Sequence, residues 1–250
     1  MCESMDGRDP GGRERLAHWF TGPLGRSLQA LESHRLRDIL PAFAGTFAVQ
    51  VGHIGDCDLL ESSPTAVHVL VDPDAGSGGA VVRALPEELP LDTRSVQVVL
   101  LAHTLDVSEQ PHQALREAER VLAPEGHVVI LGFNRVSLWR LACLFRHRRE
   151  RRPWCGAAAI GLSRLKDWLS LLDFELVRGG MLYYRPPVAQ AYLRDRLFFL
   201  ERIGDRWWPL GAAVYLVVAR KRTPGMMPIP RRARRRRLRP ASRPVGLGHG

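Results

Sequence analysis

The sequence has few cysteines, no long uninterrupted apolar run and no apolar leader. Four cysteines occur among 250 residues, and their spacing matches no zinc site, redox pair or disulfide framework. No window reaches roughly 18 consecutive apolar residues, so no transmembrane helix is expected. The polar opening residues hold no signal-peptide core. These absences predict a cytoplasmic protein with reduced thiols.

Acidic residues are missing from the last part of the chain, and this accounts for most of the net charge. The net charge is +10, but residues 223–250 hold eight arginines and no acid, which leaves +2 for residues 1–222. This basic tail has no apolar periodicity, so we expect it to be disordered. Arg231–Arg239 within it is a candidate for non-specific contact with nucleic acid or an anionic surface; the alternative is an extension with no binding role.

The remaining pattern predicts one α/β domain at residues 13–222, after a disordered N-terminus at residues 1–12. Runs such as VQVVLL and VVILGF are apolar on both faces, which is typical of a parallel sheet covered by helices on both sides. Strands are expected at residues 46–51, 67–71, 80–84, 96–102, 128–133 and 212–219, with extended segments at 174–177 and 181–184. Helices are expected within 13–40 and at 56–63, 110–122, 137–147, 162–172 (with Ser163 as N-cap) and 188–203, and a turn is expected at 124–126.

Glycines and polar residues follow the first two predicted strands, where an open parallel sheet binds ligands. Gln50, Gly52 and Gly55 end the first strand, and glycines let a backbone approach a ligand closely. Asp72 ends the second strand, and a carboxylate there can accept hydrogen bonds from both hydroxyls of a ribose. Asp74 is a second choice, and a solvated Asp-Pro turn is the alternative.

The middle of the chain carries a longer motif. An acidic-leucine-proline loop at 88–91 precedes a strand and His103, and a P-x-x-x-L-x-E-x-x-R-V-L-x-P-x-G pattern fills residues 111–126. Residues 46–134 therefore resemble the type 11 group of class I S-adenosylmethionine-dependent methyltransferases. The resemblance implies a doubly wound, mostly parallel, Rossmann-like sheet of seven strands with the last strand antiparallel. It also implies S-adenosylmethionine as cofactor, with Gly52 and Gly55 in the cofactor loop and Asp72 on the ribose.

By the same resemblance, Ala102 and His103 would line the methyl-donor site. The family usually has an acid where this chain has Gln50, and the acid that binds adenine would fall near Leu85. Either neighbouring Glu87 or backbone groups then take that role, or the affinity for the cofactor is low. These departures keep open an alternative, a binding protein that retains the fold without turnover.

Methyl transfer needs an acceptor held in line with the donor and, for some acceptors, a base. His103 is the candidate base, Asn134 can hold the acceptor, and Tyr184 or Tyr183 can donate or position; ordinary packing is the alternative for each. No metal site is expected. The predicted function is methyl transfer to an unidentified acceptor, small or otherwise. Alternatives are a nucleic-acid-associated factor using the tail and the basic stretch 146–152 (otherwise a lid helix), and, less favoured, a nicotinamide dehydrogenase, because the full G-x-G-x-x-G pattern is missing.

Overall fold

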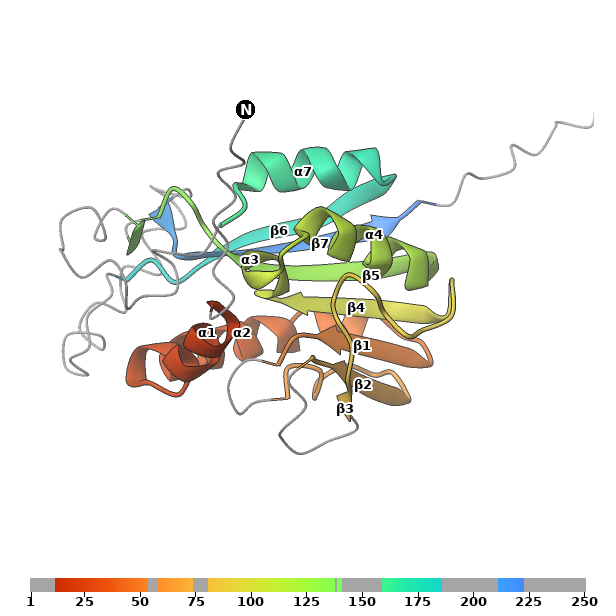
Figure 1. Ribbon diagram of the computed structural model, residues 1–250, viewed down its shortest axis with the longest axis horizontal. Coiled ribbons are helices and arrows are strands. Elements are labelled where there is room, and N and C mark those ends of the chain that lie inside the picture. Colours follow the sequence, from red (N-terminus) through yellow and green to blue (C-terminus); the bar gives the residue numbers. More distant parts are fainter. Residues whose placement is uncertain are drawn as a thin grey trace, which may run out of the picture.

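A seven-stranded sheet forms the centre of the protein (Figure 1). The computed structural model describes residues 12–53, 58–73, 81–137, 139–140, 159–185 and 211–222. The strand order is β3-β2-β1-β4-β5-β7-β6; β1 to β5 pair in parallel, and β7 is antiparallel to both β5 and β6. The strands are β1 (Phe47–Val51), β2 (Val67–Val71), β3 (Val81–Val82), β4 (Val96–Ala102), β5 (Leu122–Phe133), β6 (Phe174–Leu182) and β7 (Val214–Lys221).

The order of the strands reverses at β1, which pairs with β2 on one side and with β4 on the other. The chain moves outward from β1 to β3 and then returns to β4 on the opposite side. In an open parallel sheet, this switch point leaves a crevice beyond the carboxyl ends of the strands, where ligands bind. The ends of β1 and β4 therefore mark the expected binding site.

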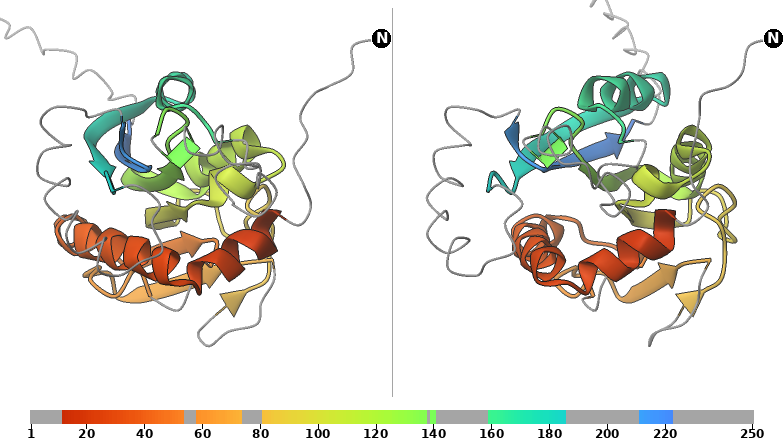
Figure 2. Two further views of the ribbon diagram at one scale, coloured as in Figure 1. Left: turned by 90° about the vertical axis from the view of Figure 1, so that its left-hand side faces the viewer. Right: turned by 60° about the vertical axis from the view of Figure 1, so that its left-hand side comes forward.

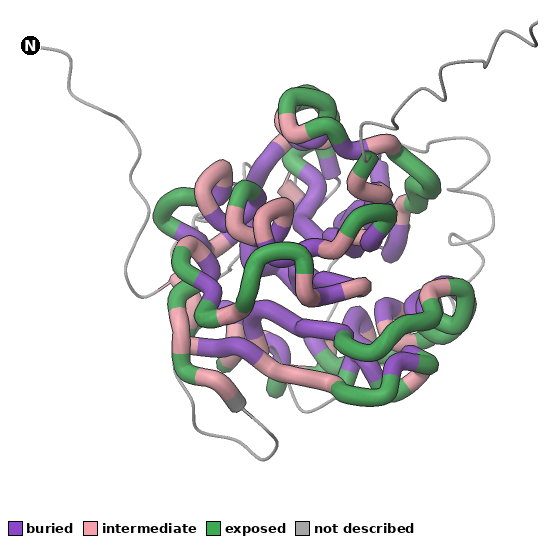
Figure 3. The backbone as a smooth tube through the Cα atoms, turned by 90° about the vertical axis from the view of Figure 1, so that its right-hand side faces the viewer, coloured by how far each residue is buried: buried purple, intermediate pink, exposed green. Residues whose placement is uncertain are grey.

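Helices cover both faces of the sheet, as the apolar strands require (Figure 2). On one face, Leu28 and Leu36 pack against alternate residues of the central strands; on the other face, Leu115 and Leu165 pack against the remaining ones. Buried residues fill the interior, and exposed segments form mainly the turns (Figure 3). The helices are α1 (Gly12–Phe20), α2 (Pro23–Arg37), the 3-10 helix η1 (Leu40–Ala42), α3 (Thr104–Val107), α4 (Pro111–Val121) and α7 (Leu162–Leu171).

Most of the expected elements are confirmed, and the exceptions have local causes. Residues 58–63 form turns rather than a helix, because the Asp58 carboxylate accepts a hydrogen bond from the Leu60 N–H at 2.8 Å. The N-cap of α7 is Gly161 rather than Ser163. The predicted turn at 124–126 lies inside β5, where the pairing with β4 shifts register and Glu125 has a φ of 63°.

Three further differences concern the second half of the chain. The two extended segments at 174–177 and 181–184 join into one strand, β6, which ends at Leu182. The short helix α3 was not predicted from the sequence. The helix expected at 188–203, both termini of the chain and most of the helix expected at 137–147 lie outside the described residues.

Arg120 explains two parts of the sequence motif at once. Its guanidinium donates to the Glu117 carboxylate at 2.8 Å and to the carbonyl oxygens of Leu89 and Leu91 at 2.9 and 3.0 Å. Glu117 in turn accepts from the Leu89 N–H at 3.1 Å and has a lowered pKa, mainly because of the hydrogen bond from Arg120. The glutamate and arginine of α4 thus fasten the acidic-leucine-proline loop to the helix.

We expect Arg120→Lys to destabilise the protein by about 1–3 kcal/mol, because an ammonium group cannot replace the forked set of hydrogen bonds. Chemical denaturation measures the change. The matched control is Arg116→Lys, on the same helix and exposed. Equal stability of the two variants would contradict the role assigned to Arg120.

Candidate functional site

The loop after β1 requires a glycine at position 52. Gly52 has a φ of +87°, and its N–H donates to the Val71 carbonyl at 2.9 Å. A Cβ atom at this position would lie 2.9 Å from the Thr104 hydroxyl, which itself donates to the Val51 carbonyl. The missing side chain therefore lets the end of β1 approach the turn that follows β4.

Gln50 and Asp72 shape the same loop from either side. Gln50 is buried, and its side-chain amide donates to the Gly52 carbonyl at 3.0 Å. Asp72, at the end of β2, accepts a hydrogen bond from the His53 N–H at 2.6 Å through Oδ2. The structure thus brings together three of the predicted cofactor residues, Gln50, Gly52 and Asp72, while Gly55 lies outside the described residues.

Helix α1 lies across the carboxyl ends of the parallel strands and forms a roof over them (Figure 2). At its start, Arg13 reaches Asp72 at the end of β2, with 3.8 Å between Nη1 and Oδ1. At its end, the Phe20 ring lies 5.5 Å from the His103 ring, and the Trp19 ring lies 6.2 Å from that of Phe133 at the end of β5. Nothing in the sequence pattern of α1 predicted a part for it in the site.

His103 is buried between two carboxylates. Nε2 lies 2.9 Å from Oε1 of Glu32 on α2, and Nδ1 lies 3.1 Å from Oδ2 of Asp106 on α3. Only 1% of the His103 surface is exposed. The same Asp106 oxygen accepts the Phe133 N–H at 2.9 Å, so the cluster also fixes the end of β5.

This environment changes the acid–base character of His103. Burial by itself lowers the pKa, but the charge of Glu32 and the hydrogen bonds to Asp106 and Glu32 outweigh it and raise the pKa from 6.5 to about 9. The imidazole is therefore charged at neutral pH, and both of its N–H groups are directed to carboxylates. In this geometry His103 has no free ring nitrogen for a substrate proton, so the observed contacts favour a positioning role over that of a base.

The other predicted site residues have structural contacts. Asn134 is buried; its amide donates to the Ala212 carbonyl at 3.0 Å, and its oxygen accepts the Val136 N–H at 3.0 Å, which joins the end of β5 to the start of β7. Glu87 accepts hydrogen bonds from the Ser108 hydroxyl and, at 3.3 Å, from the Gln110 N–H. Glu87 therefore links the loop before β4 to the start of α4.

Two further predicted residues, Ala102 and Tyr184, are both buried. Ala102 ends β4 directly before His103, at the switch point. Tyr184 follows Tyr183 in the segment after β6, and the centre of the Tyr183 ring lies 5.1 Å from that of Trp139. A role for Tyr184 or Asn134 toward an acceptor stays a prediction.

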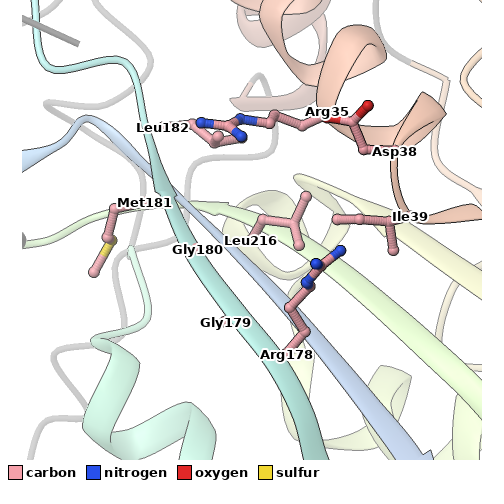
Figure 4. A pocket seen from close by; sticks show the side chains of 9 residues that line it. All are labelled: Arg35, Asp38, Ile39, Arg178, Gly179, Gly180, Met181, Leu182 and Leu216. Atoms are coloured by element: carbon pink, nitrogen blue, oxygen red, sulfur yellow. The ribbon is translucent and has the colours of Figure 1, made fainter. Parts of the chain in front are cut away.

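A surface hollow of about 250 Å³ lies elsewhere, between α2 and the edge strand β6 (Figure 4). None of the predicted site residues that the structure describes lines it; its walls are Arg35, Asp38, Ile39, Arg178, Gly179, Gly180, Met181, Leu182 and Leu216. Within the described residues, no group of three or more His, Cys, Asp or Glu side chains is placed to hold a metal ion, and no helix is long and apolar enough to cross a membrane.

The raised pKa of His103 predicts a pH-dependent stability. Its contribution, on the order of 3 kcal/mol, is complete below the unfolded value of about 6.5 and is lost as the pH rises through about 9. Glu32→Gln removes one of the two carboxylates, so we expect its stability to fall at a lower pH than that of the wild type. Thermal unfolding between about pH 6 and pH 10 measures this.

His34→Gln is the matched control, because His34 lies exposed on the same helix. Its pH profile should follow that of the wild type. Identical profiles for the wild type and Glu32→Gln would contradict the charged state assigned to His103.

Comparison with known proteins agrees with this arrangement. A family model described as "Methyltransferase domain" matches residues 46–130. The uncharacterized protein YafS of Escherichia coli is 33% identical over 207 residues, which are 82% of this chain and 80% of that protein.

Solved structures with the same fold include the following two. One is an S-adenosylmethionine-dependent methyltransferase from Thermotoga maritima, described as a possible histamine N-methyltransferase; its TM-score is 0.58 at 17% identity, over 85% of this chain and 100% of that one. The other is the [4+2]-cyclase SpnF, with a TM-score of 0.54 at 13% identity, over 85% of this chain and 95% of that one. The chain belongs to the class I S-adenosylmethionine-dependent methyltransferases of the type 11 group, with S-adenosylmethionine as the cofactor.

Proposed function

We propose that the protein is an active enzyme that transfers the methyl group of S-adenosylmethionine to an acceptor still to be identified. The observation that carries the proposal is the joint placement of Gly52 and Asp72 at the switch point of the sheet. A backbone without a side chain at the end of β1 and a carboxylate at the end of β2 are what an adenosyl group needs there.

The residues of the crevice fit this cofactor. Asp72 is an acceptor for ribose hydroxyls, and the loop through Gly52 lets the ligand approach the backbone. Glu87 is partly buried and already accepts from Ser108 and Gln110, so we assign it to fastening the loop rather than to binding adenine.

The cofactor supplies an activated methyl group on a sulfonium, so the chain mainly has to hold the reactants in line. Ala102 ends β4, and His103 follows it directly, at the switch point of the sheet. We propose that charged His103 holds the end of β4 in a fixed position relative to α2 and α3. One of its N–H groups is directed to Glu32 on α2 and the other to Asp106 on α3. The proton of the acceptor then leaves to a group other than His103.

The second candidate function is that of a binding protein that has the methyltransferase fold but does not catalyse methyl transfer. Gln50 stands where the family usually has an acid, and Leu85 is 54% exposed where an adenine-binding acid is expected. The reaction of SpnF illustrates that this fold is compatible with other chemistry. A nucleic-acid role would rest on residues 223–250 and 146–152, outside the described residues, and stays a prediction.

We expect the protein to bind S-adenosylmethionine and S-adenosylhomocysteine in the micromolar range, and Asp72→Asn to weaken both by roughly tenfold or more, because a charged acceptor is lost. Calorimetric titration measures this. Asp38→Asn, an exposed carboxylate on another surface, is the control and should bind like the wild type. Gly52→Arg should abolish binding, with its folding checked by thermal unfolding. If Asp72→Asn bound both ligands with the affinity of the wild type, Asp72 would not be a ribose-binding residue.

Turnover is a separate expectation. A panel of small amines, phenols, carboxylic acids, RNA and protein acceptors should include at least one that produces S-adenosylhomocysteine from S-adenosylmethionine with the wild type and far less with Asp72→Asn. Binding without product across the panel would favour the non-catalytic relative. Absence of binding at millimolar ligand would reject the cofactor site itself.

A further inference from the structure

A guanidinium nitrogen lies buried beside the proposed ribose site. Arg13 extends from the first turn of α1, and its Nη1 atom has no hydrogen-bond partner among the described residues although it is shielded from solvent. Asp72 lies within ion-pair distance, but Nη1 and Oδ1 are 3.8 Å apart, which is too long for a hydrogen bond. Buried N–H groups nearly always have an acceptor, so this one calls for an explanation.

The position of Arg13 is set by the helix rather than by the ion pair. Leu16 and Phe20 of α1 are each 1% exposed, and Trp19 packs edge-on against the Trp139 ring at 5.8 Å. These apolar contacts hold α1 across the strand ends, and Arg13 lies near the N-terminus of the helix. A long side chain at that point can adjust to a ligand without moving the helix.

The two carboxylate oxygens of Asp72 make different contacts. Oδ2 accepts the His53 N–H at 2.6 Å, so that oxygen is tied to the loop after β1. Oδ1 faces the Arg13 guanidinium. A hydroxyl group can donate to a carboxylate and at the same time accept from a guanidinium, since it carries one proton and two lone pairs. A vicinal diol at this point would satisfy Nη1 and retain the acidic partner.

We propose that Arg13 is a cofactor-binding residue that, together with Asp72, binds the ribose diol of the adenosyl group. The inference rests on the proposed function and adds α1 to the cofactor site. Asp72 accepts from the hydroxyls and Arg13 donates to their oxygens, so the roof helix recognises the nucleoside directly. The opposite possibility, that Arg13 merely competes with the ligand for Asp72, predicts tighter binding when the arginine is removed.

The test is calorimetric titration of the full-length protein with S-adenosylhomocysteine and with its 2′,3′-dideoxy analogue. We expect Arg13→Gln to weaken the affinity for S-adenosylhomocysteine by roughly tenfold, because a charge-assisted hydrogen bond is lost. We expect Arg13→Gln to leave the affinity for the dideoxy analogue close to that of the wild type, since that ligand lacks the hydroxyls. Arg26→Gln, an exposed arginine on α2 with the same change of charge, is the control and should not alter either affinity.

The outcomes separate this inference from the function on which it rests. Failure of the wild type to bind S-adenosylhomocysteine would overturn both. Normal binding by the wild type and by Asp38→Asn, with Arg13→Gln equal to the wild type or tighter, would overturn only the role of Arg13. If Arg13→Gln lowered the affinity for both ligands equally, Arg13 would act through general electrostatics or through the placement of α1. That result would contradict a contact with the ribose hydroxyls. Arg13→Lys, which keeps the charge and the helix, should recover part of the lost affinity, and its thermal unfolding should match that of Arg13→Gln.

Discussion

The buried contact of His103 with Glu32 and Asp106 is the constraint on which the candidate site depends. A carboxylate or an imidazolium alone in this interior would carry a large desolvation cost, and the three groups are tolerable only together. They come from α2, from the turn after β4 and from α3, and Asp106 adds the Phe133 N–H at the end of β5. The cluster therefore fixes α2, the end of β4 and the end of β5 relative to one another.

Residues 102–106, at the end of β4 and directly after it, make several of the contacts that position the candidate site. His103 adopts the left-handed region with a φ of 52°, which directs its ring toward α2 and lets α3 begin at the next residue. Thr104 then lies against Gly52, where a Cβ would be in collision. The side chain of Thr104, after β4, is thus one reason why the position after β1 must be glycine, although the two residues are far apart in the sequence. A change at either residue would displace the other.

The sequence predicted the parts of the fold that depend on local pattern. Apolar runs identified the strands, and their order placed Gly52 and Asp72 at neighbouring strand ends. It failed where a polar group acts across the fold. Glu32 is one helical turn from both Leu28 and Leu36, so it is an acid on the apolar face of α2. Such an acid indicates a buried polar partner. The local sequence does not indicate that this partner is His103. Arg13 lies in a stretch with an ordinary helical pattern, and only the packing of α1 over the strand ends brings it to Asp72. The failed helix at 58–63 has the opposite cause, a short-range Asp58 contact that competes with helix formation.

Glutamine at position 50 is better understood as part of a rebuilt loop than as a damaged cofactor motif. Its side-chain N–H group donates to the Gly52 carbonyl, and the residue is only 4% exposed. A carboxylate at this place has no proton to donate and would set its charge against the carbonyl oxygen, so the observed loop favours an amide. The loss of charge in the sequence is therefore matched by a hydrogen bond in the structure. Gly52, Gln50 and Asp72 therefore form one ordered loop at the strand ends, and the proposed cofactor site depends on this loop rather than on a charge at position 50.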